Sequence, residues 1–133
     1  MKKIRALIVD DEELARENLK FLLADYCPNV QVEGTAGSVK EATRFLKSNN
    51  IDLLLLDIEM PNGSGFELLE SLQGQIDFKI IFITAYHEYA LKAFKFSAVD
   101  YLLKPINPEE LEASIGKISP QSASEPQENI QAL

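Results

Sequence analysis

Five polar side chains at the ends of apolar runs could together carry out phosphoryl chemistry. They are Asp10, Asp11, Asp57, Thr84 and Lys104, in a chain of 133 residues. Three carboxylates close together would repel one another, and a divalent cation removes that conflict; oxygen ligands in an open, hydrated site suit Mg²⁺. A hydroxyl and an ammonium group could then contact phosphate oxygens. Such a set would form a phosphoryl-transfer site in which an aspartate is the nucleophile.

Five short apolar runs predict the strands that position these groups. The runs are Ile4–Val9, Val30–Ala36, Leu53–Leu56, Ile80–Ile83 and Val99–Leu103. The third and fourth are continuously hydrophobic, which is typical of strands covered on both faces. Segments with helical periodicity lie between the runs, and in the first of them Ala15, Leu19, Leu22 and Tyr26 form one apolar stripe.

Local signals mark where three helices begin. Ser38 with Glu41, and Ser64 with Glu67, have the spacing of a capping box, and Asn107 is followed by a proline at the first helical position. Strand and helix therefore alternate five times, and parallel strands with right-handed helical crossovers satisfy such a pattern. We predict an α/β fold built as a three-layer α/β/α sandwich. The carboxyl ends of the strands should then bring the polar groups to one edge.

Two segments are expected to behave differently from the rest. His87–Phe96 is predicted to be a helix with apolar residues on all sides, so it could be mobile or present an apolar face to a partner. Residues 119–133 have the polar composition of chains that bury too little apolar surface to order themselves. We therefore expect one domain over residues 1–118, followed by a linker or disordered tail.

Composition and charge restrict the class of protein. Hydrophobic residues make up 46% of the chain and charged residues 26%, the balance of an ordinary globular domain. The net charge of −8 opposes nucleic-acid binding, which needs a basic patch. The single Cys27 cannot form an intramolecular disulfide, no signal-peptide pattern precedes the first strand, and no apolar run approaches the roughly 20 residues that span a bilayer. We expect a cytoplasmic protein that binds neither nucleic acid nor membrane directly.

Each polar residue also has an ordinary explanation when it is considered alone. An acid after a strand is commonly a helix cap or a solvated loop residue, Thr84 could be a simple β-former, and Lys104 could be a surface residue before a proline. Their joint placement after four different strands is what favours a shared site. His87, the single histidine, is better explained as a surface residue at a helix start than as a proton shuttle.

Four motifs together resemble the receiver domains of bacterial two-component response regulators. They are Leu7-Ile8-Val9-Asp10-Asp11-Glu12, Leu56-Asp57-Ile58-Glu59-Met60-Pro61 with Gly65, Ile83-Thr84-Ala85, and Asp100-Tyr101-Leu102-Leu103-Lys104-Pro105. The likeness extends over residues 1–118. It implies a flavodoxin-like (CheY-like) fold with a five-stranded parallel sheet in the order 2-1-3-4-5. It also implies a regulatory phosphoacceptor rather than an enzyme.

The resemblance implies a role for each acidic residue. Asp57 would accept a phosphoryl group from the phosphohistidine of a partner sensor histidine kinase. Asp11 would ligate Mg²⁺ directly and Asp10 chiefly through water. Asp57 itself and the main-chain carbonyl of Glu59 would complete the protein ligands, and Mn²⁺ could substitute for Mg²⁺.

The resemblance also implies how the other site residues would bind and sense the phosphate. The Thr84 hydroxyl and the Ala85 N–H would contact phosphoryl oxygens, and Lys104 would pair with the phosphate. The Lys104–Pro105 peptide bond is typically cis in this family. Tyr101 would be the aromatic switch that moves inward when Thr84 is drawn to the phosphate.

Two segments, Ala85–Phe94 and Val99–Pro105, are similar to receivers of the LytR/AlgR type. Such receivers usually precede a LytTR DNA-binding domain and regulate transcription. Residues 119–133 are therefore interpreted as a linker toward such a domain, with a stand-alone receiver as the other interpretation. Phosphorylation would control this output, or a homodimer formed through the fourth helix, fifth strand and fifth helix.

Three other protein classes share part of this pattern. Phosphatases with an Asp-x-acid nucleophile place that motif after the first strand, whereas Asp57 follows the third. Flavodoxin-like electron carriers need a phosphate loop rich in Ser, Thr and Gly after the first strand, where this chain has acids. A phosphorylation-independent interaction module of receiver fold generally lacks an acid, the hydroxyl or the lysine. This module remains the alternative, although every such position is filled here.

Overall fold

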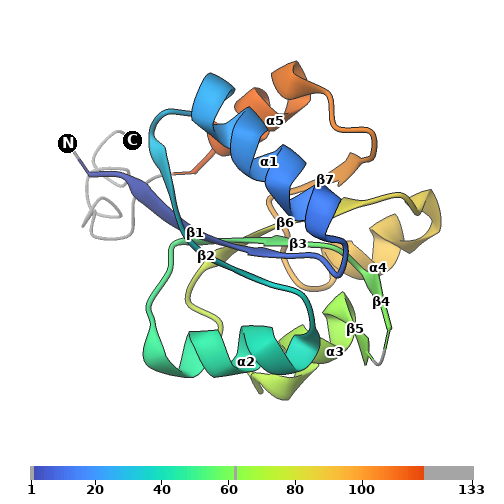
Figure 1. Ribbon diagram of the computed structural model, residues 1–133. Helices are drawn as coiled ribbons and strands as arrows, with labels where there is room; N and C mark the ends of the chain where they lie inside the picture. Colours follow the sequence, from blue (N-terminus) through green and yellow to red (C-terminus); the bar gives the residue numbers. More distant parts are fainter. Residues whose placement is uncertain (1, 62, 119–133) are drawn as a thin grey trace, which may run out of the picture.

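The computed structural model describes residues 2–61 and 63–118, and the predicted linker at 119–133 lies outside this part. A five-stranded parallel sheet in the order β2-β1-β3-β6-β7 forms the middle layer (Figure 1). Its strands are β1 (Ile4–Val9), β2 (Val30–Ala36), β3 (Leu53–Leu56), β6 (Lys79–Thr84) and β7 (Asp100–Leu103). The predicted three-layer fold and its strand order 2-1-3-4-5 are therefore confirmed, because β6 and β7 are the fourth and fifth predicted strands.

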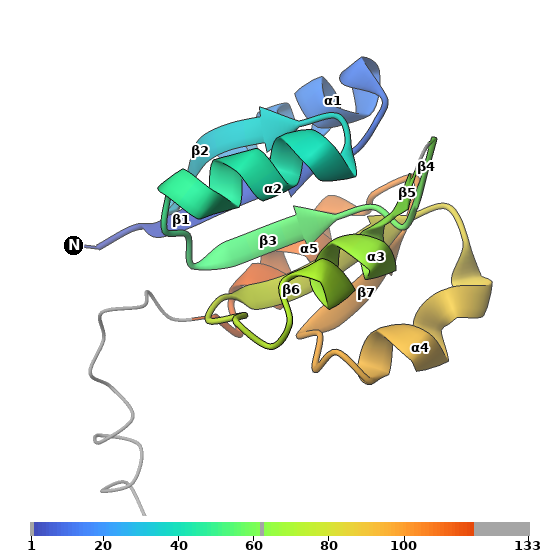
Figure 2. The same ribbon diagram turned by 90° about the horizontal axis from the view of Figure 1, so that it is seen from below.

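Helices cover both faces of the sheet (Figures 1 and 2). One face packs against α1 (Glu13–Tyr26) and α5 (Pro108–Ile115). The other packs against α2 (Val39–Ser48), α3 (Gly65–Ser71) and the segment formed by the 3₁₀ turn η1 (His87–Tyr89) and α4 (Ala90–Phe94). The four leucines of β3 are fully buried because this strand lies in the centre of the sheet. Within the described residues, no helix is long and apolar enough to cross a membrane.

Several local predictions need correction. The apolar stripe predicted for the first helix is wrong at Tyr26, whose side chain is 43% exposed. The buried residues of α1 are Leu19 and Leu23, which are four positions apart and therefore share one face of the helix. The capping box is complete at Ser64, but at Ser38 it is not, because the Glu41 carboxylate accepts from Gly37 N instead. The hydroxyl of Ser38 still accepts from the main chain of Glu41 and caps the helix.

The segment after β6 is shorter and less regular than predicted. The expected helix His87–Phe96 is a 3₁₀ turn followed by the five-residue α4, and Ala93 is its buried residue. Leu91 and Phe94 are 84% and 78% exposed, so the apolar residues around this helix divide between core and solvent. A short antiparallel hairpin of β4 (Glu59–Met60) and β5 (Gly63–Ser64) between β3 and α3 was not expected from the sequence.

Gly65 is required by the close approach of α3 to the end of β3. A Cβ atom at this position would lie 2.4 Å from the carbonyl oxygen of Asp57 and 3.0 Å from the Leu56 side chain. We expect Gly65→Ala to lower the free energy of unfolding by about 1–3 kcal/mol, the usual result of overpacking a filled interior. Urea unfolding will measure this change. Gly116→Ala is the control, since its Cβ would meet atoms only at 3.4 Å or beyond; an equal loss there would contradict the steric argument.

Candidate functional site

Three carboxylates from two neighbouring strands meet at the carboxyl end of the sheet. β1 and β3 pair in parallel with Val9 opposite Leu56, so the residues that follow them emerge side by side. Asp10, Asp11 and Asp57 each offer an oxygen, and these oxygens lie within 4.8 Å of one another. Asp10 and Asp57 are buried and Asp11 is half-buried. The arrangement suits a divalent cation, because three carboxylates this close together repel one another when no cation neutralises them.

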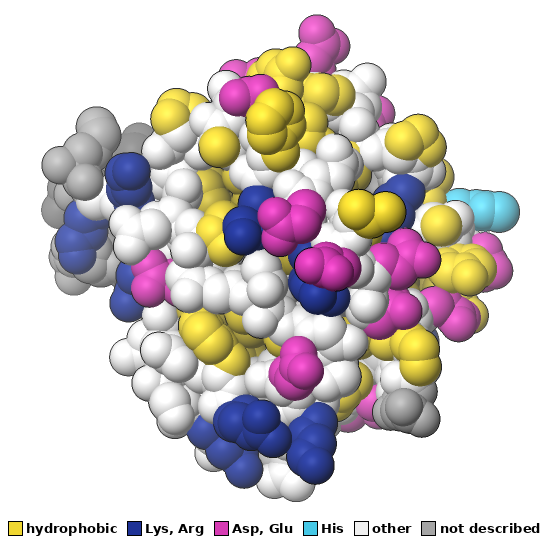
Figure 3. Space-filling view, in the orientation of Figure 1, with side chains coloured by type: hydrophobic (Ala, Val, Ile, Leu, Met, Phe, Trp, Pro, Cys, Tyr) yellow, Lys and Arg dark blue, Asp and Glu magenta, His cyan; other side chains and the backbone are white. Residues whose placement is uncertain are grey.

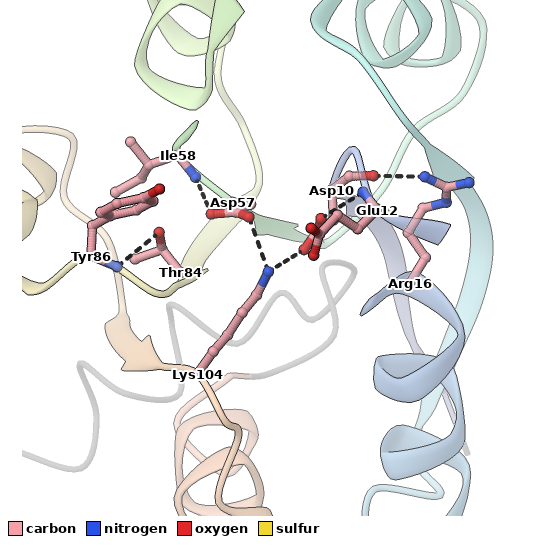
Figure 4. Close-up of polar contacts among 8 residues, drawn as sticks. All are labelled: Asp10, Glu12, Arg16, Asp57, Ile58, Thr84, Tyr86 and Lys104. Carbon is pink, nitrogen blue, oxygen red and sulfur yellow. Dashed lines mark hydrogen bonds and ion pairs between the residues drawn. The ribbon is translucent and has the colours of Figure 1, made fainter. Parts of the chain in front are cut away.

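Lys104 connects two of these acids (Figure 4). Its Nζ lies 2.7 Å from Asp10 Oδ2 and 3.0 Å from Asp57 Oδ2. The main-chain N–H of Lys104 donates to the carbonyl of Thr84 at 2.9 Å, which places the lysine at the end of β7 beside β6. The Lys104–Pro105 peptide bond is cis. An ammonium group thus faces the carboxylate that is the candidate nucleophile.

Burial and charge act in opposite directions on these groups. Burial raises the pKa of Asp57 above its ordinary value, although the Lys104 charge and the Thr84 hydroxyl act to lower it. Burial acts to lower the pKa of Lys104, but the hydrogen bond to Asp10 and the charge of Asp57 outweigh it, so this pKa is raised. The lysine therefore stays charged, and burial disfavours the ionised form of Asp57.

The loops hold the acids in place through main-chain contacts. Asp57 Oδ1 accepts from Ile58 N at 2.6 Å, so the second oxygen of this carboxylate is the one that faces Lys104. Asp10 Oδ1 accepts from Glu12 N at 3.0 Å, and the Arg16 guanidinium donates to the Asp10 carbonyl at 2.8 Å (Figure 4). The contact of Arg16 with Asp10 was not expected from the sequence, because no local pattern predicts that an arginine in a helix will bind the carbonyl at the end of the preceding strand.

The residues at the end of β6 stand across from Asp57. Thr84 is fully buried, and its Oγ1 accepts from Tyr86 N at 3.4 Å. Ala85, predicted to supply an N–H to a phosphate, is exposed. The half-buried Tyr101 on β7 packs its ring 6.1 Å from that of Phe82, and its hydroxyl donates to the carbonyl of Tyr86. The two predicted switch residues, Thr84 and Tyr101, thus contact the same residue, Tyr86.

A contact on the other side of the site was not expected from the sequence. The Tyr89 hydroxyl donates to Glu59 Oε2 at 2.5 Å, and this hydrogen bond raises the pKa of Tyr89 to about 12. Glu59 is two residues after Asp57 and lies in β4. No local sequence pattern predicts the hydrogen bond between Tyr89 and Glu59, because the two residues are 30 positions apart.

The surface around the site is acidic. In the space-filling view, Asp and Glu side chains gather at the side where β1 and β3 end, whereas Lys and Arg side chains gather over α2 and near the N-terminus (Figure 3). The basic group over α2 consists of Lys40, Arg44 and Lys47. Negative charge near the opening favours a cation at the carboxylate cluster.

Comparison with known proteins gives one consistent result. The profile of the response regulator receiver domain family matches residues 6–116. The transcriptional regulatory protein BtsR of Salmonella typhimurium is 42% identical over 134 residues, which cover 98% of this chain and 56% of BtsR. The sensory transduction protein LytT of Enterococcus faecalis is 42% identical over 127 residues, which cover 95% of this chain and 52% of LytT. The chain thus spans about half the length of these relatives.

Solved structures agree with the sequence matches. The response regulatory domain of protein mrkE from Klebsiella pneumoniae superposes with a TM-score of 0.79 at 30% identity, covering 86% of this chain and 94% of that one. The response regulator TrrA from Thermotoga maritima, solved in complex with Mg²⁺-BeF, gives a TM-score of 0.75 at 38% identity, with coverages of 88% and 98%.

Proposed function

The chain belongs to the response regulator receiver family, and from that membership we propose that it is a phosphorylation-controlled switch whose acceptor is Asp57. The family membership predicted from the sequence is confirmed, and the LytT relatives agree with the predicted LytR/AlgR type. Receivers of this family act in two-component signalling with sensor histidine kinases. The cytoplasmic location and the partnership with a cognate sensor histidine kinase stay predictions.

One observation carries the proposal: the Asp57 carboxylate stands between a lysine and two further acids at the end of the sheet. Lys104 Nζ is 3.0 Å from Asp57 Oδ2, and ligand oxygens of Asp10, Asp11 and Asp57 lie within 4.8 Å. We propose that these acids and the main-chain carbonyl of Glu59 hold Mg²⁺, or Mn²⁺ in its place. When bound, the metal would neutralise negative charge on the carboxylates and on a phosphoryl group.

The chain's own residues would carry the transfer. A carboxylate oxygen of Asp57 attacks phosphorus, a new O–P bond forms, and the N–P bond of the kinase phosphohistidine breaks with its electron pair on the imidazole nitrogen. Lys104 would transfer its ion pair from the carboxylate to the phosphoryl oxygens. Thr84 and the main-chain N–H of Ala85 would donate to the same oxygens, and the Thr84 hydroxyl, which already acts on the Asp57 carboxylate, would shift to them.

That movement would supply the switch. Tyr101 and Thr84 both contact Tyr86, so a shift of Thr84 toward the phosphate alters the position of the Tyr101 ring. We propose that this changes the face formed by α4, β7 and α5, where Leu91, Phe94 and Leu103 are exposed. Phosphorylation would then drive homodimerisation or control an output domain. Light scattering that finds a monomer both with and without a stable phosphate mimic would contradict the dimer.

The output itself is proposed from the relatives. BtsR is named as a transcriptional regulator, and this chain matches only 56% of it. We propose a transcriptional output through a LytTR DNA-binding domain that follows the 119–133 segment. A direct measurement is DNA binding by the whole native protein, with and without phosphorylation. A native protein without such a domain would support the stand-alone receiver.

Intact-mass spectrometry after incubation with acetyl phosphate tests the central proposal. We expect one phosphoryl adduct that forms with Mg²⁺ present and fails to form when the metal is chelated. A folded protein that gains no adduct in either condition would overturn the proposal. That result would favour the phosphorylation-independent interaction module and direct attention to the exposed face of α4 and β7.

A further inference from the structure

The segment of η1 and α4 is attached to the rest of the molecule by few contacts. Ala93 is the buried residue of α4, and no residue of η1 is buried. The Tyr89 ring packs edge-on against Phe66 at 6.1 Å, and Lys92 lies 4.7 Å over the Phe66 ring. The polar anchor that ties this segment to β4 is the hydrogen bond from the Tyr89 hydroxyl to Glu59 Oε2 at 2.5 Å. A helix held this lightly is sensitive to the loss of one contact.

The same segment is connected to the opposite side of the site. Tyr86 donates its N–H to Thr84 Oγ1 and accepts the Tyr101 hydroxyl at its carbonyl. Its ring also lies 6.1 Å from the Tyr89 ring. The chain from Thr84 to Tyr89 is thus fixed at one end to the predicted phosphate-sensing residue and at the other to Glu59. Movement at one end must be accommodated at the other.

The Asp57 carboxylate is already paired in the observed arrangement of the loops. Asp57 Oδ1 accepts from Ile58 N and Oδ2 pairs with Lys104 Nζ, while Thr84 Oγ1 accepts from Tyr86 N within its own loop. A phosphoryl group at Asp57 would draw Lys104 Nζ and the Thr84 hydroxyl toward its own oxygens and away from these positions. Contacts that stabilise the present loop therefore oppose phosphorylation.

We propose that Tyr89 is a positioning residue that acts through Glu59, holding residues 86–94 in the observed arrangement and thereby slowing phosphoryl uptake at Asp57. The inference rests on the proposed function. A contact that exists in one of two arrangements shifts the population toward it, and its removal raises the population of the other. The tyrosine touches neither phosphate nor metal in this proposal.

The first test is the rate of phosphoryl uptake by Tyr89→Phe from acetyl phosphate at saturating Mg²⁺. We expect this rate to rise about threefold to tenfold, the size that follows from removing one hydrogen bond. Tyr26→Phe is the matched control, because Tyr26 is partly exposed on α1 and its hydroxyl has no hydrogen bond among the described residues. An unchanged rate in Tyr89→Phe would contradict the proposal.

A comparison of backgrounds separates positioning from packing. Glu59→Gln keeps an acceptor for the tyrosine hydroxyl, and Glu59→Ala removes it. We expect Tyr89→Phe to accelerate uptake when it is added to Glu59→Gln and to have no effect when it is added to Glu59→Ala. Each comparison is made within one background, so the change of charge at residue 59 cancels. An equal acceleration in both backgrounds would show that Tyr89 acts without Glu59 and would overturn the proposal.

Amide hydrogen exchange tests the anchor without any phosphorylation. In the unmodified protein, Tyr89→Phe should increase exchange in residues 87–94 severalfold and leave β1 and β3 unchanged. If no variant takes up phosphate but this local increase is seen, the anchor holds and the proposed function fails. If uptake is normal and exchange does not change, the proposed function holds and the anchor is wrong.

Discussion

Asp57→Asn is expected to take up no phosphoryl group from acetyl phosphate and Mg²⁺ while remaining at least as stable as the original protein. The amide oxygen can still accept from Ile58 N, and Lys104 keeps its 2.7 Å contact with Asp10. What disappears is the anionic oxygen that would attack phosphorus. Intact-mass spectrometry and urea unfolding of the same samples measure the two quantities.

The expected stability follows from the direction of the Asp57 pKa. Burial raises this pKa in the folded protein. Protonated Asp57 therefore contributes to the stability of the folded state at a pH below about 4, where an aspartate of the unfolded chain titrates. This contribution is lost as the pH rises through the pKa that Asp57 has in the folded protein. At neutral pH the buried, ionised carboxylate lowers the free energy of unfolding, so its replacement by a neutral amide should not lower that free energy further. A clearly destabilised variant would contradict this account.

The control for Asp57→Asn is Asp25→Asn, which makes the same chemical change at an exposed position in α1. We expect this control to take up phosphate at the original rate. Persistence of the adduct in Asp57→Asn would assign the acceptor to another residue. It would leave the family membership intact but remove the proposed chemistry.

Lys104→Met is expected to reduce the rate of phosphoryl uptake by about 100-fold, the loss typical when one positioned charge stabiliser is removed from a reaction site. The ammonium group pairs with Asp57 now and would pair with the phosphoryl oxygens during transfer. Methionine keeps most of the volume of the lysine stem and removes its charge. The measurement is the initial rate of adduct formation over a range of acetyl phosphate concentrations.

Lys117→Met provides the matched control, because Lys117 Nζ also pairs with an aspartate, Asp100, at 2.9 Å. That pair joins the turn after α5 to β7 and lies outside the carboxylate cluster. A similar loss of rate in both variants would mean that lysine pairs act by stabilising the fold. Loss in Lys104→Met alone would locate the effect at Asp57.

Much of the fold was predictable because its signals are local. The continuous leucines of the third strand and the isoleucines of the fourth predicted strands buried on both faces, and both lie in the middle of the sheet. The Ser64 capping box and the proline after Asn107 marked helix starts within a residue. Tyr26 was wrongly predicted to belong to the apolar stripe of α1, because helical periodicity near a helix end does not show which side chains the following loop covers.

The strand order could be predicted through the family resemblance, and the polar residues that follow each strand could be named from the amino-acid sequence. Their convergence then follows from parallel strands, whose carboxyl ends share one edge. The donor that each carboxylate contacts became apparent in the folded structure alone: Lys104 contacts Asp10 across 94 positions, and the Tyr89 hydroxyl contacts Glu59 across 30. Such pairings depend on loop paths and side-chain rotamers that packing selects, and no periodicity along the chain records them.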